Sequence, residues 1–288
     1  MSRKNIFEIL AETNDLEKDV ERIDQLFGSE KLLVRKALYK DEIYTIKCFV
    51  AQFCFDYWKN RGHCIDLDDF LEAVDYDGYY DKAMDGDIDA FFVFLEIVIN
   101  CWKLAELCMA KNEEIKHYTN FYLLFDIITD CLSHYNHKAV YDENTEQMLV
   151  VEDNPAITAV AEIVKPKLSL DVLKYNHHTL RGEIDKKKAI LLALGAELEP
   201  KRKALSEVNR GLEDDIFFML NNLNLRHNNI SSDDKNYKEF VSKMEVKTLE
   251  NWYDELYQMM LLALLEIDQI ERNSRVKTLK ADINGGKQ

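Results

Sequence analysis

The segment between Asn221 and Asn229 contains five asparagines, one arginine and one histidine. Asparagine is unfavourable inside a helix because its amide competes for backbone hydrogen bonds, so this cluster costs stability unless the amides have another use. Arg226 supplies a permanently charged planar group that suits phosphate, and His227 can exchange a proton near neutral pH. These two side chains form a minimal set for metal-independent RNA cleavage, in which the 2′-hydroxyl group attacks the adjacent phosphate. The sequence therefore predicts Arg226 and His227 as catalytic residues.

Neighbouring polar side chains are candidates for binding the substrate. Asn222, Asn228 and Asn229 flank the Arg-His pair, and Lys187 lies in a basic segment, residues 165–210, which has eleven basic and six acidic side chains. A basic segment beside Arg226 predicts a groove for RNA. A structural explanation stays open, in which the asparagines end a helix, Arg226 pairs with an acid and the lysines form a solvated face.

Two long helices are predicted to hold this cluster at their junction. Apolar residues recur at three- and four-residue spacing over residues 205–223 and again over residues 249–270, which is typical of amphipathic helices. The polar segment 226–243 joins them, so we expect an antiparallel pair. A third helix is predicted over residues 179–198, with a kink or restart at Glu199-Pro200.

A helix pair with an Arg/His/Asn motif at its junction resembles the HEPN superfamily of all-helical proteins. The run Leu225-Arg226-His227-Asn228-Asn229, followed by a helix that carries Trp252-Tyr253-Asp254, is similar to HEPN-like proteins of the abortive-infection type. The resemblance implies a dimeric endoribonuclease of bacterial antiviral defence or toxin systems, with a composite site to which each protomer contributes Arg226 for phosphate and His227 for proton transfer. In the family several residues separate the arginine from the histidine, whereas here the two are adjacent, so a relative that binds without cleaving is an alternative.

The remaining helices and the domain boundaries follow from apolar spacing and from helix-breaking residues. Helices are predicted over residues 15–27, 44–58, 87–111 and 118–136, a β-hairpin over 138–152, and a short helix opened by Asn154-Pro155 and closed by Pro166. We expect an all-α multi-helix bundle with a small β-hairpin insertion between two helical regions. The predicted organisation is an N-terminal helical domain (1–137), a hairpin and linker (138–153), a C-terminal HEPN-like domain (154–280) and a flexible tail (281–288).

Acidic side chains favour a second class of function. The chain has a formal net charge of −16, which argues against non-specific binding to DNA or to an anionic membrane. Eleven of its acids lie between Asp66 and Glu96, where Lys82 is the one basic residue. The alternative hypothesis is therefore a non-catalytic interaction module that binds a protein partner, such as one from the same operon, through its acidic N-terminal half.

Two further clusters have the residue types of metal sites but lack essential members. Asp85, Asp87, Asp89 and Glu96 have the spacing of a calcium loop, yet Ala90 stands where that loop needs glycine. Cys131, His134 and His137 lack an obvious fourth zinc ligand. We therefore expect no metal and no cofactor. A calcium site at the first cluster and a zinc site at the second stay open as alternatives.

Composition bears on fold and compartment. Nine glycines and three prolines among 288 residues disfavour folds with many tight turns. The six cysteines do not form a disulfide framework, and the most apolar stretch, residues 90–109, contains Glu96, Asn100, Lys103 and Glu106, which are costly in a lipid bilayer. We expect a cytoplasmic homodimer without a membrane span.

Overall fold

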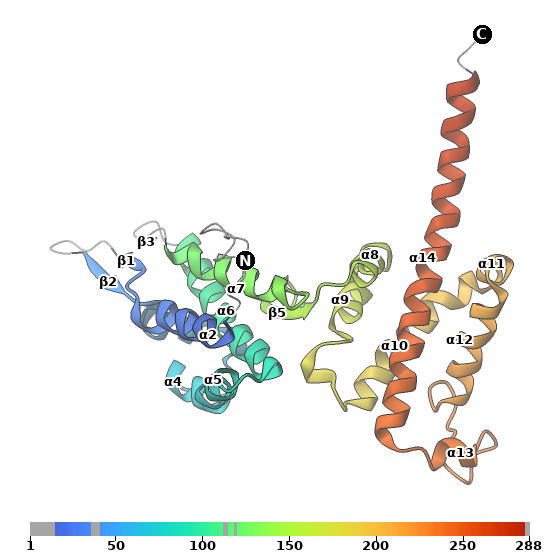
Figure 1. The fold of residues 1–288 in the computed structure, drawn as a ribbon, viewed down its shortest axis with the longest axis horizontal. Helices are drawn as coiled ribbons and strands as arrows, with labels where there is room; N and C mark the ends of the chain where they lie inside the picture. The colour runs from blue at the N-terminus through green and yellow to red at the C-terminus, as the bar shows by residue number, and fades with distance from the viewer. Residues whose placement is uncertain (1–14, 36–40, 112–114, 118–119, 286–288) are drawn as a thin grey trace, which may run out of the picture. The chain divides into compact units, whose positions relative to one another are not determined.

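The computed structural model describes residues 15–35, 41–111, 115–117 and 120–285, with the backbone alone for 115–117. The described residues form many helices and two small β-sheets (Figure 1). The predicted all-α multi-helix bundle with a small hairpin insertion is therefore confirmed. Within the described residues, no helix combines the length and apolar character that a membrane crossing requires.

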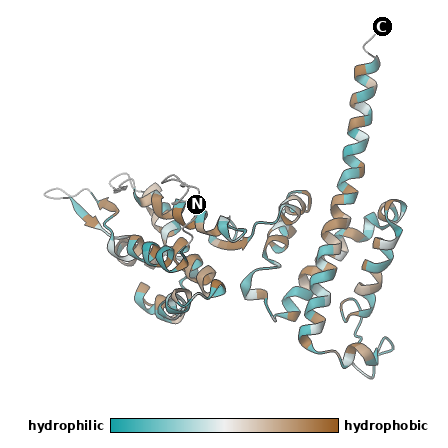
Figure 2. Cartoon of the chain, in the orientation of Figure 1, coloured by the Kyte–Doolittle hydropathy of each residue, from teal (hydrophilic) through white to brown (hydrophobic). Residues whose placement is uncertain are grey.

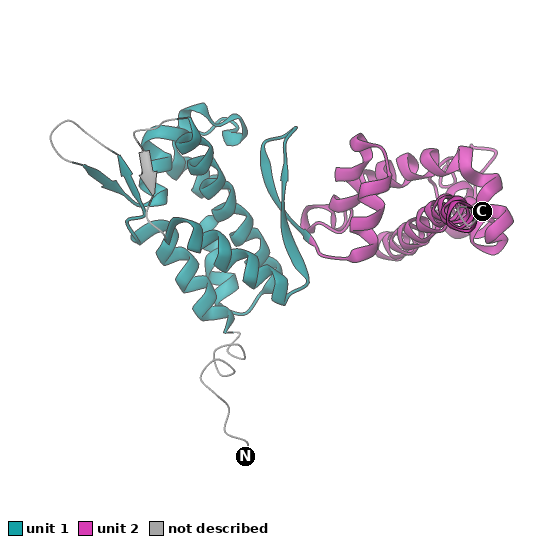
Figure 3. Cartoon of the chain, turned by 90° about the horizontal axis from the view of Figure 1, so that it is seen from above, with its two compact units in different colours: residues 1–151 teal, residues 152–288 magenta. Residues whose placement is uncertain are grey.

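The chain divides between Val151 and Glu152 into two compact units (Figure 3). We call residues 1–151 unit 1 and residues 152–288 unit 2. Each unit has its own cluster of buried apolar side chains, so each is described by itself.

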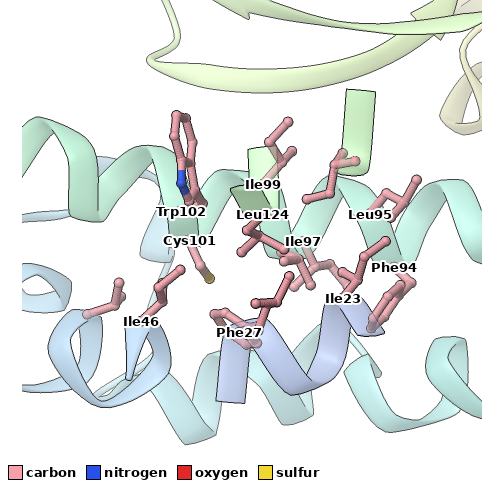
Figure 4. Packing of buried hydrophobic residues seen from close by; sticks show 14 of the residues in the cluster. Ile23, Phe27, Ile46, Phe94, Leu95, Ile97, Ile99, Cys101, Trp102 and Leu124 are labelled. Carbon is pink, nitrogen blue, oxygen red and sulfur yellow. The ribbon is translucent and has the colours of Figure 1, made fainter. Parts of the chain in front are cut away.

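Unit 1 is built around α6 (Ile88–Ala110), a helix that is apolar over most of its circumference. Asp87 begins it, because its carboxylate accepts hydrogen bonds from the backbone N–H groups of Asp89 and Ala90. Figure 4 shows side chains of α6 meeting those of other helices in the core, among them Ile23 and Phe27 from the N-terminal segment. The other helices of the unit are α2 (Leu16–Asp24), α3 (Ile46–Phe49), α4 (Leu67–Ala73), α5 (Tyr76–Met84) and α7 (Asn120–His134).

The sequence predicts one regular helix over residues 44–58, and the structure corrects this. The helix α3 continues as a π-helical segment, Val50–Cys54, and then as a 3-10 turn, Phe55–Tyr57. In π turns the hydrogen bonds join residues five apart, so such residues share a face. Phe49 and Cys54 form one such pair and Val50 and Phe55 another, and all four side chains are buried. The widened turns therefore bury on one side residues that a regular α-helix would spread around its axis.

The predicted hairpin is confirmed as β4 (His137–Asp142) and β5 (Gln147–Glu152). The helix α6 holds β5 through two polar side chains. Asn100 donates to the Met148 carbonyl at 2.8 Å and accepts from the Met148 N–H at 2.9 Å, while Glu96 accepts from the Val150 N–H at 2.8 Å. Polar residues in this apolar helix thus satisfy the backbone of the hairpin.

Unit 1 also contains a small antiparallel sheet that the sequence analysis missed. Its strands lie in the order β2 (Glu42–Tyr44), β1 (Leu33–Arg35), β3 (Ile115–His117), with Val34 opposite both Ile43 and Lys116. Three-residue strands are too short for the apolar alternation that identifies a strand. The first two residues of the helix predicted over 118–136 lie outside the described residues.

Unit 2 consists of helices that pack around the long helix α14 (Val246–Gly285). Asn154 caps α8 and Pro155 occupies its first turn, as predicted, because the Asn154 side chain accepts from the Ala156 N–H at 2.9 Å. Pro166 begins the next helix rather than only ending the previous one. The other helices are α8 (Pro155–Ile163), α9 (Pro166–Lys174), α10 (Ile184–Leu198), α11 (Arg202–Val208), α12 (Arg210–Asn222) and α13 (Glu239–Ser242).

Three predictions for this unit need correction. The helix predicted over 179–198 begins later, at Ile184, after a 3-10 turn, His178–Leu180. The helix predicted over 205–223 is two helices, because Asn209 leaves the helical conformation (φ −145°, ψ 80°) and its side chain caps α12 by accepting from the Leu212 N–H. Residues 281–285 of the predicted flexible tail belong to α14, since no helix-breaking residue precedes Gly285; residues 286–288 lie outside the described part of the chain.

Candidate functional site

The asparagine-rich segment leaves α12 through one residue in a left-handed conformation. Asn224 has φ +57°, a region that asparagine tolerates better than other non-glycine residues. The chain then turns back, so that the Arg226 N–H donates to the Leu220 carbonyl at 2.9 Å. The Tyr253 hydroxyl of α14 donates to the Leu223 carbonyl at 3.0 Å. The junction is therefore fixed by a backbone hydrogen bond to α12 and by a side-chain hydrogen bond from α14.

Asn229 is fully buried and organises the loop between α12 and α13. Its side-chain oxygen accepts from the Asn224 N–H at 2.8 Å, and its amide donates to the Asn236 carbonyl at 2.8 Å. Its carbonyl accepts from the Lys238 N–H at 2.8 Å. The predicted substrate-binding amide of Asn229 thus satisfies backbone groups of the loop.

The other two asparagines of the predicted site make local contacts. The Asn222 amide donates to the Phe218 carbonyl of its own helix at 2.8 Å. The exposed Asn228 accepts from the N–H groups of Ile230 and Ser231 at 3.3 and 3.1 Å, which is the pattern of an asparagine turn. Both contacts explain why asparagine is abundant at a helix end.

Arg226 is partly buried between α10 and α12. Its guanidinium group forms an ion pair with Glu199 and lies over the ring of Phe217, with 5.1 Å from the guanidinium carbon to the ring centre. Gly195 of α10 makes room for Leu220 of α12, because a Cβ atom there would lie 3.1 Å from Leu220 Cδ1, whereas its distance of 3.7 Å from Arg226 Nη2 would be an ordinary contact. His227, the next residue, is exposed. The predicted phosphate ligand is therefore neutralised by an acid of its own unit.

Lys187, another predicted site residue, is also buried, with 5% of its surface exposed. Its ammonium group lies 2.8 Å from Glu250 and 2.7 Å from Asp254 of α14, and 5.2 Å from the ring centre of Tyr175. Burial by itself would raise the pKa of Glu250, but hydrogen bonds from Lys187 and the Gly182 N–H, with the positive charge of Lys187, lower it below its usual value. Lys187 thus joins α10 to α14 and does not present its charge to solvent.

Beside the junction lies an apolar hollow that the sequence analysis missed, which we call the α12–α14 groove. It has a volume of about 390 Å³. Three large side chains at its edge are exposed, namely Phe218 by 65%, Phe240 by 79% and Trp252 by 46%. The groove is lined by Phe218, Met219, Asn222, Leu223, Lys238, Phe240, Val241, Met244 and Trp252. The sequence contained one sign of this groove. Phe218 lies outside the apolar stripe of residues 205–223, and Phe240 lies in the polar segment 226–243.

In unit 1, ten acids between Asp66 and Asp89 are exposed to solvent, and we call them the acidic surface. They lie on α4, on α5 and at the start of α6, and α5 packs against both other helices. Lys47 pairs with Asp68 at 3.4 Å and Lys82 with Asp75 at 3.7 Å. The members of the acidic surface are Asp66, Asp68, Asp69, Glu72, Asp75, Asp77, Asp81, Asp85, Asp87 and Asp89.

The two residue patterns that resemble metal sites take other forms in the structure. Residues 91–96 belong to α6, so the calcium-loop spacing that ends at Glu96 does not form a loop. Cys131 is buried in α7, whereas His137 lies beyond that helix in β4. The His137 ring stacks on Phe92, with 4.0 Å between ring centres.

Comparison of the chain with protein-family models, with curated proteins and with solved structures finds no match.

Proposed function

We propose that this protein is a cytoplasmic, non-catalytic helical interaction module that binds a basic segment of a protein partner through the acidic surface of unit 1. The observation that carries the proposal is that all ten carboxylates of this surface are exposed on consecutive, mutually packed elements. Like charges held at this density repel one another, and a cationic partner relieves that repulsion.

The acidic surface also exposes apolar side chains. Ile65 is 78% exposed immediately before Asp66, and Ile88 is exposed between Asp87 and Asp89. Carboxylates around exposed isoleucines match a segment that is both basic and apolar, such as an amphipathic helix with lysines or arginines beside leucines. We therefore take a basic amphipathic helix as the occupant, in preference to a polycation such as polylysine.

Three of the side chains assigned to the ribonuclease hypothesis are engaged within unit 2, whereas His227 is exposed. Arg226 pairs with Glu199, Asn229 satisfies loop backbone and Lys187 is held by two carboxylates. These contacts favour the interaction hypothesis over catalysis. The HEPN-type ribonuclease of bacterial defence or toxin systems stays a prediction, with its own test below.

Binding is tested with a synthetic amphipathic helical peptide that has leucines on one face and lysines on the other, measured by fluorescence anisotropy with the full chain. We expect binding that weakens as salt is added and that the variant Asp77→Asn/Asp81→Asn weakens by about tenfold, because two charges are removed from the acidic surface. The control variant Glu207→Gln/Asp215→Asn removes two exposed acids of unit 2 and should bind like the wild type. Equal weakening by both variants, or no binding by the wild type, would contradict the proposal.

Incubation with total RNA tests the competing hypothesis. We expect the wild type to leave RNA intact, and the variants Arg226→Ala and His227→Ala to behave in the same way. Cleavage by the wild type that both substitutions abolish would establish the ribonuclease and would refute a purely non-catalytic module.

A further inference from the structure

The last part of α14 lacks support from its own unit. The buried side chains of this helix end at Ile267, and residues 271–284 are all exposed. Figure 1 shows this end of α14 extending beyond the other helices of unit 2. Residues 268–285 add about 27 Å of helix at the usual rise per residue. Because most of the stability of a helix in a protein comes from tertiary packing of its apolar face, a second surface that covers this end would stabilise it.

An apolar stripe continues along this end of the helix. Leu262, Val276, Leu279 and Ile283 are exposed by 48%, 45%, 56% and 62%, and Leu265 is partly exposed. These residues fit an alternating three- and four-residue spacing, which is the pattern of a coiled-coil seam. Figure 2 shows such apolar positions recurring along the otherwise hydrophilic end of α14. Leu262 lies on the opposite side of the helix from Met260 and Leu264, which are buried in unit 2, whereas Leu265 also packs against the core of that unit.

The same spacing extends towards the start of α14 through polar residues. Gln258 and Glu255 precede Leu262 on the seam, and Gln269 and Arg272 follow Leu265. All four are exposed. The seam therefore has two leucines at its centre, with a glutamine and then a charged residue on either side, and the two charges are opposite.

This order is complementary to itself when two copies of α14 run antiparallel. With Leu262 opposite Leu265 of the second copy, Gln258 lies opposite Gln269 and Glu255 opposite Arg272, each pair occurring twice about the two-fold axis. The leucines bury apolar surface, the glutamine amides can exchange hydrogen bonds, and the charges attract. A parallel pair would instead set Glu255 against Glu255 and Arg272 against Arg272.

The antiparallel register also places the apolar end of one helix beside the α12–α14 groove of the other copy. The register carries Ile283 past the start of the other α14 at Val246, and Met244, two residues before that start, lines the groove. Val276 falls opposite position 251, next to the exposed Trp252. The exposed aromatic edge of the groove in one copy and the exposed stripe of α14 in the other copy would thus cover each other. The two-fold axis makes this contact occur twice in the dimer.

We propose that α14 is the interface of a homodimer in which two copies pair antiparallel along this seam, with Glu255 of each copy facing Arg272 of the other. The occupant of the groove edge is then a second copy of this chain. The inference is independent of the acidic surface, and a dimer would present that surface twice to one partner.

Analytical ultracentrifugation of the full chain between about 1 and 100 µM tests the proposal through mass action. The wild type is expected to dimerise. Glu255→Arg alone and Arg272→Glu alone should each weaken the dimer by about tenfold or more, because each replaces two attractive pairs by two repulsive ones. The double variant Glu255→Arg/Arg272→Glu should recover wild-type dimerisation within about threefold, since it restores opposite charges across the seam.

The control variant is Glu271→Arg, an exposed charge on the same helix but away from the seam, which should leave the dimer unchanged. Circular dichroism of each variant confirms that the helices persist. A monomeric wild type, a single reversal that has no effect, or a double variant as weak as the single ones would overturn the proposal. A parallel dimer would give the second of these results, because each single reversal there replaces one pair of like charges by another.

Discussion

Replacement of Lys187 by methionine distinguishes a structural role for this side chain from a role in binding RNA. Methionine keeps the apolar stem of the side chain but removes its charge. Glu250 and Asp254 then lose the ammonium group that lies 2.8 and 2.7 Å from them. If Lys187 bound a substrate, the variant would lose binding and keep its stability.

The geometry sets the size of the expected loss. Removal of one member of a fully buried ion pair costs about 3–5 kcal/mol. The side chain of Glu250 is 16% exposed and that of Asp254 is 43% exposed, so solvent screens both remaining carboxylates in part. We expect unit 2 to lose about 2–3 kcal/mol of unfolding free energy.

The measurement is native-state hydrogen exchange of peptides from α10 and α14, because this follows unit 2 separately in a chain with two units. Exchange of the most protected amides should accelerate by roughly 30- to 150-fold. The matched control is Lys186→Met, since Lys186 is exposed and pairs with Glu183 on the surface at 3.2 Å; a change below about 0.5 kcal/mol is expected there. Equal effects of the two substitutions would refute the reasoning. The double variant Lys187→Met/Glu250→Gln should recover part of the loss, because it removes an unpaired carboxylate.

Three further predictions follow from burial and hydrogen bonding. Asn229→Ala should destabilise unit 2 by about 2–4 kcal/mol in the same exchange assay, because it leaves two partly buried loop groups unpaired. The exposed Asn228→Ala should cost about 1 kcal/mol or less, and equal costs would contradict the assigned network. The pKa of Glu250 lies below its ordinary 4.5, so its stabilising contribution should be complete above pH 4.5 and disappear as the pH falls through the lower folded value. Acid titration of unit 2 stability measures this loss. The same loss in Lys187→Met as in the wild type would count against the Lys187–Glu250 pair. Burial raises the pKa values of Cys101 and Cys131 to about 12, so iodoacetamide should modify the exposed Cys48 first and leave these two thiols intact in the native protein, as read by mass spectrometry.

Several elements of the fold were predictable because their signals are local. The stripe of α14, the proline and asparagine that open α8, and the turn residues of the β4–β5 hairpin all act through neighbours in the sequence. Apolar periodicity, capping and turn chemistry need no knowledge of the rest of the chain. The break at Asn209 also had a local signal, since asparagine is a preferred cap, but the continuous apolar stripe across it concealed the end of one helix and the start of the next.

Other features depended on contacts between distant parts of the chain. The π turns after α3 arise because Phe49, Val50, Cys54 and Phe55 must all face one core, and tertiary packing decides this against regular helical spacing. The polar residues Glu96 and Asn100 interrupt an apolar helix. Only the tertiary structure shows that β5 supplies their hydrogen-bond partners.

The sequence by itself determined an acidic, helical chain and the chemical nature of the Asn221–Asn229 cluster. Only the tertiary structure decided how these side chains are used. Arg226 meets Glu199, Lys187 meets Glu250 and Asp254, and Asn229 meets the loop backbone. The physical reason is that a charge or an amide has the same local sequence signal whether its partner is a ligand or a side chain of the same protein. That partner becomes known only when the chain has folded and burial requires each polar group to be paired.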